Sequence, residues 1–285
     1  WLAPILLILF NAVPVVAMDG WMQARGWSTP GGDPVGLAGL QALLWIGFAP
    51  PLLLVLAWVR GVERRSLASI GLTGAAPLET FLRGLAVGFA TIALVVGAIW
   101  AAGGMQAAGI GPAWRSPSGL LQIALLLPAF VFQSSVEEVM FRGWLLSTVA
   151  RRAGVPVAVL LVSLAFGLLH YSPHQPPLVM ASTVLFSLFA CAWVLRSGNL
   201  WGVMGWHAGW NWLLAVGFEL PVTGLDAHLP ALLVALRPQG GDALTGGTQG
   251  PEGSVLCVVF FALASAWMLV RARKARAGLP ATGLR

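Results

Sequence analysis

The chain has 285 residues, of which 58% are hydrophobic and 9% are charged, and its formal net charge is +6. Soluble globular chains are roughly half apolar and about one quarter charged, so sixteen basic and ten acidic side chains are too few to cover a surface that faces water. The composition therefore excludes a soluble globular domain, a disordered chain, a disulfide scaffold and a nucleic-acid-binding domain, and it indicates an integral membrane protein.

Apolar stretches near the length needed to cross a bilayer, roughly 20 residues, recur along the whole chain. The sequence predicts eight membrane-spanning helices, at about residues 1–18, 36–59, 80–102, 119–150, 155–172, 178–195, 199–218 and 254–270. The first segment has no basic residues before it and no small-residue cleavage site, so we interpret it as a retained helix rather than a signal peptide. We expect an all-α integral membrane protein, with a single multi-pass domain over residues 1–285.

Basic residues alternate between the loops on the two sides of these predicted spans. One set of loops contains eleven Lys and Arg residues and the other contains three. The positive-inside rule therefore places the basic loops and both termini in the cytoplasm. On the opposite side we expect an uncharged turn at Ser172–Pro177 and a long loop at Pro221–Gly253. The apolar patch Leu229–Leu236 in that loop predicts a short interfacial or re-entrant helix.

Ionisable groups are rare inside the predicted spans, and those present gather in a few places. Glu137 and Glu138 stand side by side in the long apolar stretch 119–150, and Arg142 follows Glu138 by four residues, on the same helix face. This spacing allows an ion pair that neutralises two buried charges, but it leaves Glu137 without a basic partner on its helix. Charged residues at membrane depth usually mark a functional site.

Two histidines and an asparagine lie on other predicted spans. His170 ends the apolar run FGLLH, whereas His207 and Asn211 are four residues apart on one helix face. At 1.5 Å per residue, Glu137 and His170 lie about 21 and 22 Å from the cytoplasmic ends of their helices. His207 lies only about 10 Å from the start of its own helix, and it is therefore shallower unless that helix is tilted or re-enters the membrane. Each residue taken alone is equally consistent with a polar contact between helices. Their combination favours a reaction site.

Such a set of groups is suited to hydrolysis by an activated water molecule. A carboxylate and a neutral imidazole can together hold a water and accept its proton, and a His and an Asn four residues apart can donate hydrogen bonds to one oxyanion. Glu137, His170 and His207 could instead bind a divalent metal such as zinc, which would activate the water. No Ser or Cys stands out as a nucleophile, and Ser134 and Ser135 are expected to serve helix packing.

Three short motifs carry a resemblance to a known family. The segments EEVMFR, FGLLH and HAGWN have the order and spacing of the EExxxR, FxxxH and HxxxN/D motifs of the CAAX-protease and bacteriocin-processing family. These intramembrane proteases are similar to the type II CAAX prenyl endopeptidase. The resemblance is strongest over Ser134–Asn211, within a core of about residues 119–218, and the segments SLASIGL and TGGTQGPEGS also resemble bacterial members.

The resemblance implies an eight-helix protein around a polar cavity in the membrane, in a bacterium the inner membrane. It assigns Glu137 and His170 to water activation and His207 and Asn211 to oxyanion stabilisation. It also implies supporting roles for Glu138, Arg142 and Phe166. The implied partners are membrane lipid and a hydrophobic, prenylated or membrane-anchored peptide or protein. No cofactor is fixed by the motifs, and a divalent metal such as zinc stays an alternative.

A non-proteolytic membrane protein is the competing interpretation. It would be a transporter that uses the buried Glu and His residues as an ion site, or a bacteriocin immunity or scaffold protein. A transporter predicts polar residues along the length of several spans, whereas here they gather at one level. This clustering favours the protease.

Overall fold

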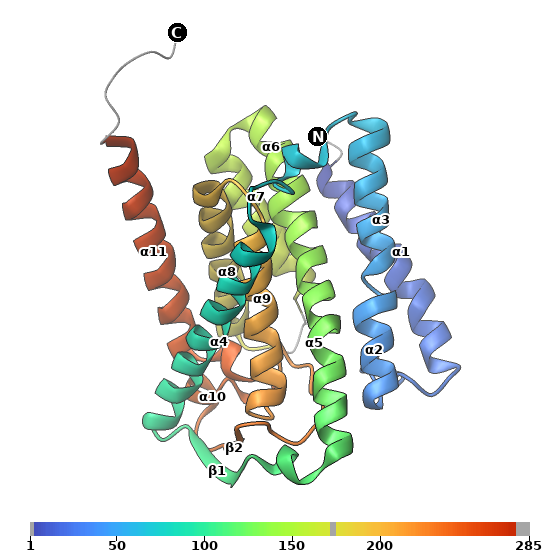
Figure 1. The fold of residues 1–285 in the computed structure, drawn as a ribbon, viewed down its shortest axis with the longest axis vertical. Coiled ribbons are helices and arrows are strands. Elements are labelled where there is room, and N and C mark those ends of the chain that lie inside the picture. The colour runs from blue at the N-terminus through green and yellow to red at the C-terminus, as the bar shows by residue number, and fades with distance from the viewer. Residues whose placement is uncertain (1–2, 172–174, 278–285) are drawn as a thin grey trace.

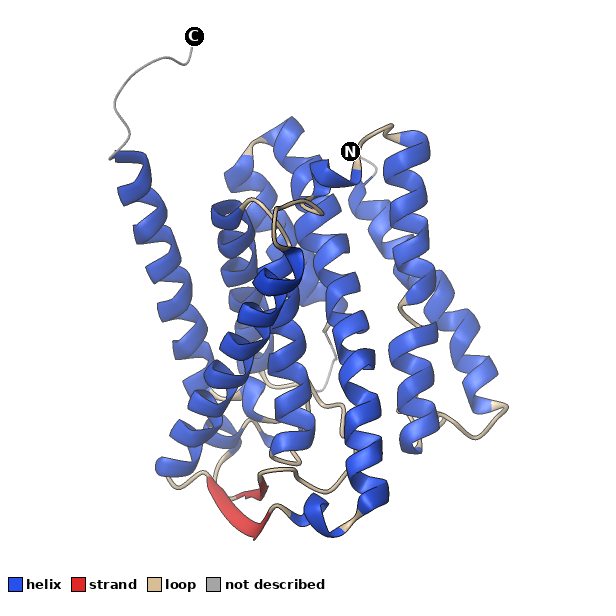
Figure 2. Cartoon of the chain, viewed as in Figure 1, coloured by secondary structure: helices blue, strands red, loops and turns tan. Residues whose placement is uncertain are grey.

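The computed structural model describes residues 3–171 and 175–277, so residues 172–174 of the predicted turn Ser172–Pro177 lie outside the described chain. Long helices run roughly side by side, and a short two-stranded sheet closes one end of the bundle (Figures 1 and 2). The helices are α1 (Ala3–Gln23), α2 (Gly36–Ile46), α3 (Ala49–Ala57), α4 (Pro77–Ala101), α5 (Pro117–Glu138), α6 (Leu146–Ala153), α7 (Val155–Leu169), α8 (Pro177–Ser197), α9 (Trp201–Trp212), α10 (Asp242–Thr245) and α11 (Val255–Ala277). Three π-helical segments continue α3, α5 and α9, namely η1 (Trp58–Val62), η4 (Val139–Leu145) and η5 (Leu213–Gly217).

The helices agree in position with the predicted spans, each of which is helical over most of its length. Within the described residues, four helical segments are long and apolar enough to cross a membrane: Gly36–Val62, Pro77–Ala101, Pro117–Ala153 and Pro177–Ser197. Two more helices, Val155–Leu169 and the Val255–Met268 part of α11, are apolar but shorter. The described part of the chain is thus mostly helical with four candidate membrane-spanning helices, and eight crossings stay a prediction.

Local sequence explains where the site-bearing helices begin and end. Ser116 accepts a hydrogen bond from the Gly119 backbone N–H at 3.0 Å and caps α5, and Pro117 occupies the first turn of the same helix. At the other end, Gly154 adopts a φ of 81° between α6 and α7, a value that favours glycine. The chain therefore turns back at Gly154 and brings α7 beside the end of α5.

Small residues let α4 and α9 pack backbone to backbone. A Cβ atom added at Gly84 or Gly88 of α4 would overlap the backbone carbonyl of Gly202 or Trp206, and one added at Gly205 of α9 would overlap the carbonyl of Phe81. Gly84 and Gly88 are four residues apart, the small-xxx-small spacing that allows helices to approach closely in membranes. This packing places α9 in the centre of the bundle, where every residue from Gly202 to Asn211 is buried.

The long loop between η5 and α11 contains a strand where a helix was predicted. Strand β2 (Val234–Pro238) pairs antiparallel with β1 (Met105–Ile110), so the expectations of an all-α fold and of a short helix at Leu229–Leu236 are wrong in this region. The backbone N–H groups of Leu232, Leu233 and Leu236 donate to the carbonyls of Val216, Gly217 and Phe218. The extended conformation thus satisfies the carbonyl groups at the end of η5, which a helix in this loop would leave unpaired.

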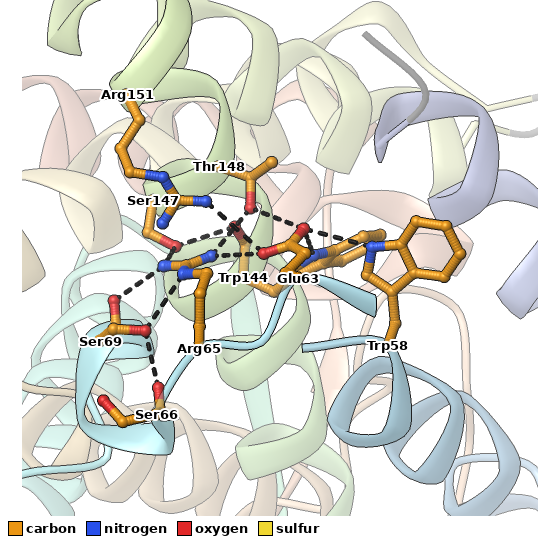
Figure 3. Close-up of polar contacts among 9 residues, drawn as sticks. All are labelled: Trp58, Glu63, Arg65, Ser66, Ser69, Trp144, Ser147, Thr148 and Arg151. Carbon is orange, nitrogen blue, oxygen red and sulfur yellow. Dashed lines mark hydrogen bonds and ion pairs between the residues drawn. The ribbon is translucent and has the colours of Figure 1, made fainter. Parts of the chain in front are cut away.

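At the opposite end of the bundle, the link after α3 is tied to η4 and α6 by a polar network (Figure 3). Oε1 of Glu63 accepts hydrogen bonds from the indole N–H groups of Trp58 and Trp144, at 3.2 and 3.0 Å. Nη1 of Arg65 lies 2.7 Å from Oε2 of Glu63. These contacts hold the link against the helix that carries the paired glutamates.

Arg65 extends the same network to neighbouring hydroxyl groups. Its guanidinium donates to Ser147 Oγ at 2.8 Å, to Thr148 Oγ1 at 3.1 Å and to Ser69 Oγ at 3.1 Å. Arg151 adds a second cation, 3.5 Å from Oε2 of Glu63. The predicted basic loops that contain Arg65 and Arg151 therefore lie at the same end of the bundle.

Candidate active site

Three helices bring the motif residues together around one pocket. Glu137 lies at the end of α5, His170 directly follows α7, and His207 and Asn211 project from α9. These four side chains line a pocket of about 350 Å³. The four residues assigned to catalysis from the sequence are therefore neighbours in space, although they come from segments as much as 74 residues apart.

Glu138 joins two of the motifs directly. Its Oε1 lies 3.1 Å from Nη1 of Arg142 and 2.8 Å from Nδ1 of His207. The side chains of Glu138 and Arg142 are fully buried, with no exposed surface. The predicted ion pair between Glu138 and Arg142 is present. The contact with His207 was not indicated by the sequence, and through it Glu138 also orients the imidazole ring.

The two ring nitrogens of His207 face the two glutamates. Nδ1 contacts Glu138, and Nε2 lies 3.8 Å from Oε2 of Glu137. Because an ionised carboxylate only accepts hydrogen bonds, Nδ1 of His207 must donate to Glu138. Nε2 is left facing the pocket beside Glu137.

The ring of His170 is held in one tautomer by its own helix. Nδ1 lies 2.8 Å from the backbone carbonyl oxygen of Phe166, which can only accept, so Nδ1 carries the hydrogen. In the neutral ring Nε2 is then a free acceptor. The Phe166 ring packs against the imidazole with centroids 4.4 Å apart, and the Arg142 guanidinium lies 4.2 Å from the Phe166 centroid. Phe166 thus connects His170 to the buried ion pair.

Asn211 contacts polar residues of α5 that the sequence analysis did not assign to the site. Its Nδ2 donates to Gln133 Oε1 at 3.3 Å and to Ser134 Oγ at 3.4 Å. Ser134 in turn donates to Gln133 Oε1 at 3.1 Å. Gln133 lines the pocket. It precedes Glu137 by four residues on the same helix face, and this spacing could have identified Gln133 from the sequence as a pocket residue.

The remaining lining of the pocket is largely apolar, with one further carboxylate. The apolar side chains come from α2, α5, α7, α8 and α11 and from the residue before α3, and they include Leu43, Leu44, Phe48, Phe130, Leu169, Phe186 and Phe261. Glu252, in the loop before α11, also lines the pocket, although the sequence analysis treated it only as a loop charge. The sequence feature that could have identified Glu252 is its position in TGGTQGPEGS, a segment that resembles bacterial members of the family.

His207 is deeper than its position in the sequence suggested. The sequence left open whether His207 lies nearer the cytoplasmic end than Glu137, and Nε2 of His207 lies 3.8 Å from Oε2 of Glu137, because α9 begins well inside the bundle. Leu200, just before α9, is fully buried, and its backbone N–H donates to the Gly71 carbonyl at 3.0 Å. The link 63–76 therefore covers the start of α9, and His207 reaches the level of Glu137.

The geometry of Glu137, His170 and His207 also bears on whether these residues could bind a divalent metal ion. Within residues 3–171 and 175–277, no group of three or more His, Cys, Asp or Glu side chains gathers closely enough to hold a metal ion. The Nδ1 contacts of His170 and His207 are of the kind that orient zinc ligands, yet Glu137, His170 and His207 do not converge on one point. The residues as placed do not fit a three-ligand zinc site, and we derive no step through a metal.

Comparison with known families supports the motif-based resemblance. Residues 119–213, about one third of the chain, match the family model described as type II CAAX prenyl endopeptidase Rce1-like. No curated protein and no solved structure gives a significant match. The matched segment contains Glu137, His170, His207 and Asn211, and over this segment the chain is similar to the Rce1-like type II CAAX prenyl endopeptidase family.

Proposed function

We propose that the protein is an intramembrane endopeptidase that hydrolyses peptide bonds of membrane-associated substrates. The observation that carries the proposal is that Glu137, His170, His207 and Asn211 all line one pocket. Two of these side chains are suited to accept a proton, and two are suited to donate hydrogen bonds. Hydrolysis without a covalent intermediate needs both kinds of group.

In this mechanism, Glu137 and Nε2 of His170 hold a water molecule and accept its proton as the water oxygen attacks the peptide carbonyl carbon. The hydrogen bond from Nδ1 of His170 to the Phe166 carbonyl keeps Nε2 free to accept. When the tetrahedral intermediate collapses, the same proton passes to the nitrogen of the leaving amine. Protons and charge are then balanced over the cycle.

His207 and Asn211 would stabilise the negative charge that develops on the carbonyl oxygen. Because Nδ1 of His207 donates to Glu138, Nε2 can donate to an oxyanion only when both ring nitrogens carry hydrogen. The long Asn211 contacts to Gln133 and Ser134 can be exchanged for a stronger bond to the oxyanion.

The apolar lining of the pocket supports a hydrophobic, prenylated or membrane-anchored substrate. Leucine and phenylalanine side chains surround the polar groups on several sides. The excess of basic residues in alternate loops supports cytoplasmic termini and, for a bacterial protein, a place in the inner membrane.

The direct test is cleavage of a library of hydrophobic-tailed and prenylated peptides by the purified protein in detergent. Glu137→Gln keeps the shape of the side chain but removes the base, so we expect the turnover rate to fall by about 10²–10⁴-fold. Glu79→Gln is the matched control, because Glu79 is exposed and pairs with the exposed Arg83. Equal turnover by the Glu137 variant and the wild type would contradict the mechanism, whereas no cleavage of any peptide by the wild type would favour an immunity or scaffold role.

A further inference from the structure

Glu252 is a carboxylate of the pocket that the proposed chemistry does not use. It lies in the short 3-10 helix η7 (Pro251–Gly253), outside the matched segment 119–213, yet it lines the same pocket as His207 and Asn211. A carboxylate in a largely apolar pocket must find hydrogen-bond donors or lose solvation energy. The partners of Glu252 therefore indicate what it does.

Both carboxylate oxygens of Glu252 are engaged by donors from two different segments. Oε1 accepts the indole N–H of Trp210 at 2.9 Å, and Oε2 accepts the backbone N–H and the hydroxyl of Thr223 at 2.7 and 2.8 Å. Trp210 precedes Asn211 on α9 and follows His207 by three residues. Glu252 thus connects the helix of the oxyanion donors to the chain segment that follows it.

The second partner is held in an unfavourable conformation. Thr223 has a φ of 46°, which is rare for a β-branched residue and costs free energy unless other contacts compensate. Thr223 also lines the pocket. The two hydrogen bonds to Glu252 are the contacts that compensate for this conformation.

The glycine-rich loop before Glu252 is built to reach this position. The Gly224 backbone N–H donates to the Gln249 carbonyl at 3.1 Å, so the loop runs against the turn that contains Thr223. Gly250 has a φ of 80°, and a Cβ atom at this position would overlap the Pro221 carbonyl. The glycines of TGGTQGPEGS thus allow Glu252 to approach both Thr223 and α9.

We propose that Glu252 is a positioning residue that clamps α9 and the Thr223 turn together, and thereby aligns His207 and Asn211 with the pocket. The inference rests on the proposed function. All three partners donate, so a carboxylate is required. An amide at this position accepts through one oxygen only and presents an N–H₂ group to a donor.

The first test is kinetic and uses the full chain with the peptide that the wild type cleaves. Glu252→Gln and Trp210→Phe each remove part of the clamp, and we expect kcat to fall roughly 10- to 100-fold while KM changes little, as for a misplaced catalytic group. Glu219→Gln is the matched control, because Glu219 also follows α9 but pairs with Arg237 and does not line the pocket. Trp210→Phe also covers the case in which Glu252→Gln fails to fold.

Coupling separates a positioning role from a general loss of stability. If Glu252 acts through α9, Glu252→Gln will reduce kcat much less when Asn211→Ala is already present. Multiplicative losses in the double variant, or wild-type kcat in both single variants, would overturn the inference.

A second readout does not depend on activity. Amide hydrogen exchange of the segment 220–226 should be faster in Glu252→Gln than in the wild type and in the Glu219→Gln control, because the Thr223 N–H loses its acceptor. Faster exchange in a protein that cleaves no peptide would support the clamp and contradict the protease. Unchanged exchange would contradict the clamp.

Discussion

Glu138 shows how a single buried carboxylate can serve two partners. Its Oε1 contacts both the Arg142 guanidinium and the His207 imidazole. The charge of Arg142 compensates Glu138 in a place without solvent, and Glu138 in turn fixes the ring of His207. We therefore expect the supporting role predicted for Glu138 to act through His207.

Replacement of Arg142 by Leu should strongly destabilise the protein. The change leaves Glu138 charged and buried without its cation, which costs about 3–5 kcal/mol when a buried pair is broken. We expect a large drop in the thermal unfolding midpoint of the detergent-purified protein. The double variant Glu138→Leu/Arg142→Leu should regain stability but not peptide cleavage, because His207 then loses its hydrogen-bond acceptor. A stable Arg142→Leu single variant would show that the pair contributes little.

Glu63 should make stability depend on pH. Burial raises its pKa, but hydrogen bonds from Arg65, Trp144 and Trp58 and the charge of Arg65 lower it by more, so that the pKa lies below its ordinary value of 4.5. A lowered pKa in the folded state stabilises the protein above the ordinary value, and this contribution is lost as the pH falls toward the folded value.

The measurement compares the thermal unfolding midpoints of the wild type and Glu63→Gln between about pH 7 and about pH 3. The wild type should unfold at the higher temperature at neutral pH, and the difference should shrink below about pH 4.5. A difference that is independent of pH would mean that Glu63 stabilises the network without its charge.

At the scale of the elements, the crossing of α4 and α9 positions His207 and Asn211. Gly205 of α9 faces the Phe81 carbonyl with no room for a methyl group, and Gly88 of α4 faces the Trp206 carbonyl. Gly205→Ala and Gly88→Ala should therefore separate the helices, lower the unfolding temperature and reduce cleavage. Gly97→Ala is the matched control, because nothing lies within 4 Å of a Cβ atom on this other glycine of α4. Equal losses in the control would exclude the close approach as the cause.

The sequence predicted the elements better than their contacts. Apolar length alone located the helices, and the spacing of Glu138 and Arg142 predicted their ion pair, because both signals are local along the chain. The contact of Glu138 with His207 depends on how deeply α9 is placed, and that depth depends on Leu200 packing beneath the link 63–76. The pairing of β1 with β2 and the contacts of Glu252 with Trp210 and Thr223 likewise join segments that are distant along the chain. No local sequence pattern therefore revealed them.

For the molecule as a whole, the two ends of the bundle should face opposite sides of the membrane. The link after α3 and strand β2 lie at opposite ends of the bundle (Figure 1). Ala68 lies in that link, Gly241 follows β2, and both residues are exposed. A cysteine introduced at Gly241 should react with an impermeant thiol reagent outside intact cells, and one at Ala68 should react only after the cells are opened. The native Cys191 and Cys257 are buried and give little background. The reverse pattern would invert the proposed orientation.

The central position of α9 has a consequence for how the chain enters the membrane. This helix is short and carries His207 and Asn211, and its residues from Gly202 to Asn211 contact protein rather than lipid. Alone in the bilayer, a newly synthesised α9 would expose these polar side chains to lipid and would be unstable. It must therefore pack against helices synthesised before it, α4 and α5 among them. A substitution that fills the glycine surface of α4 would then act during biogenesis. Its first effect would be a lower amount of protein in the cell rather than a lower rate of cleavage. Chains in which α9 fails to pack against α4 would be removed by quality-control proteases.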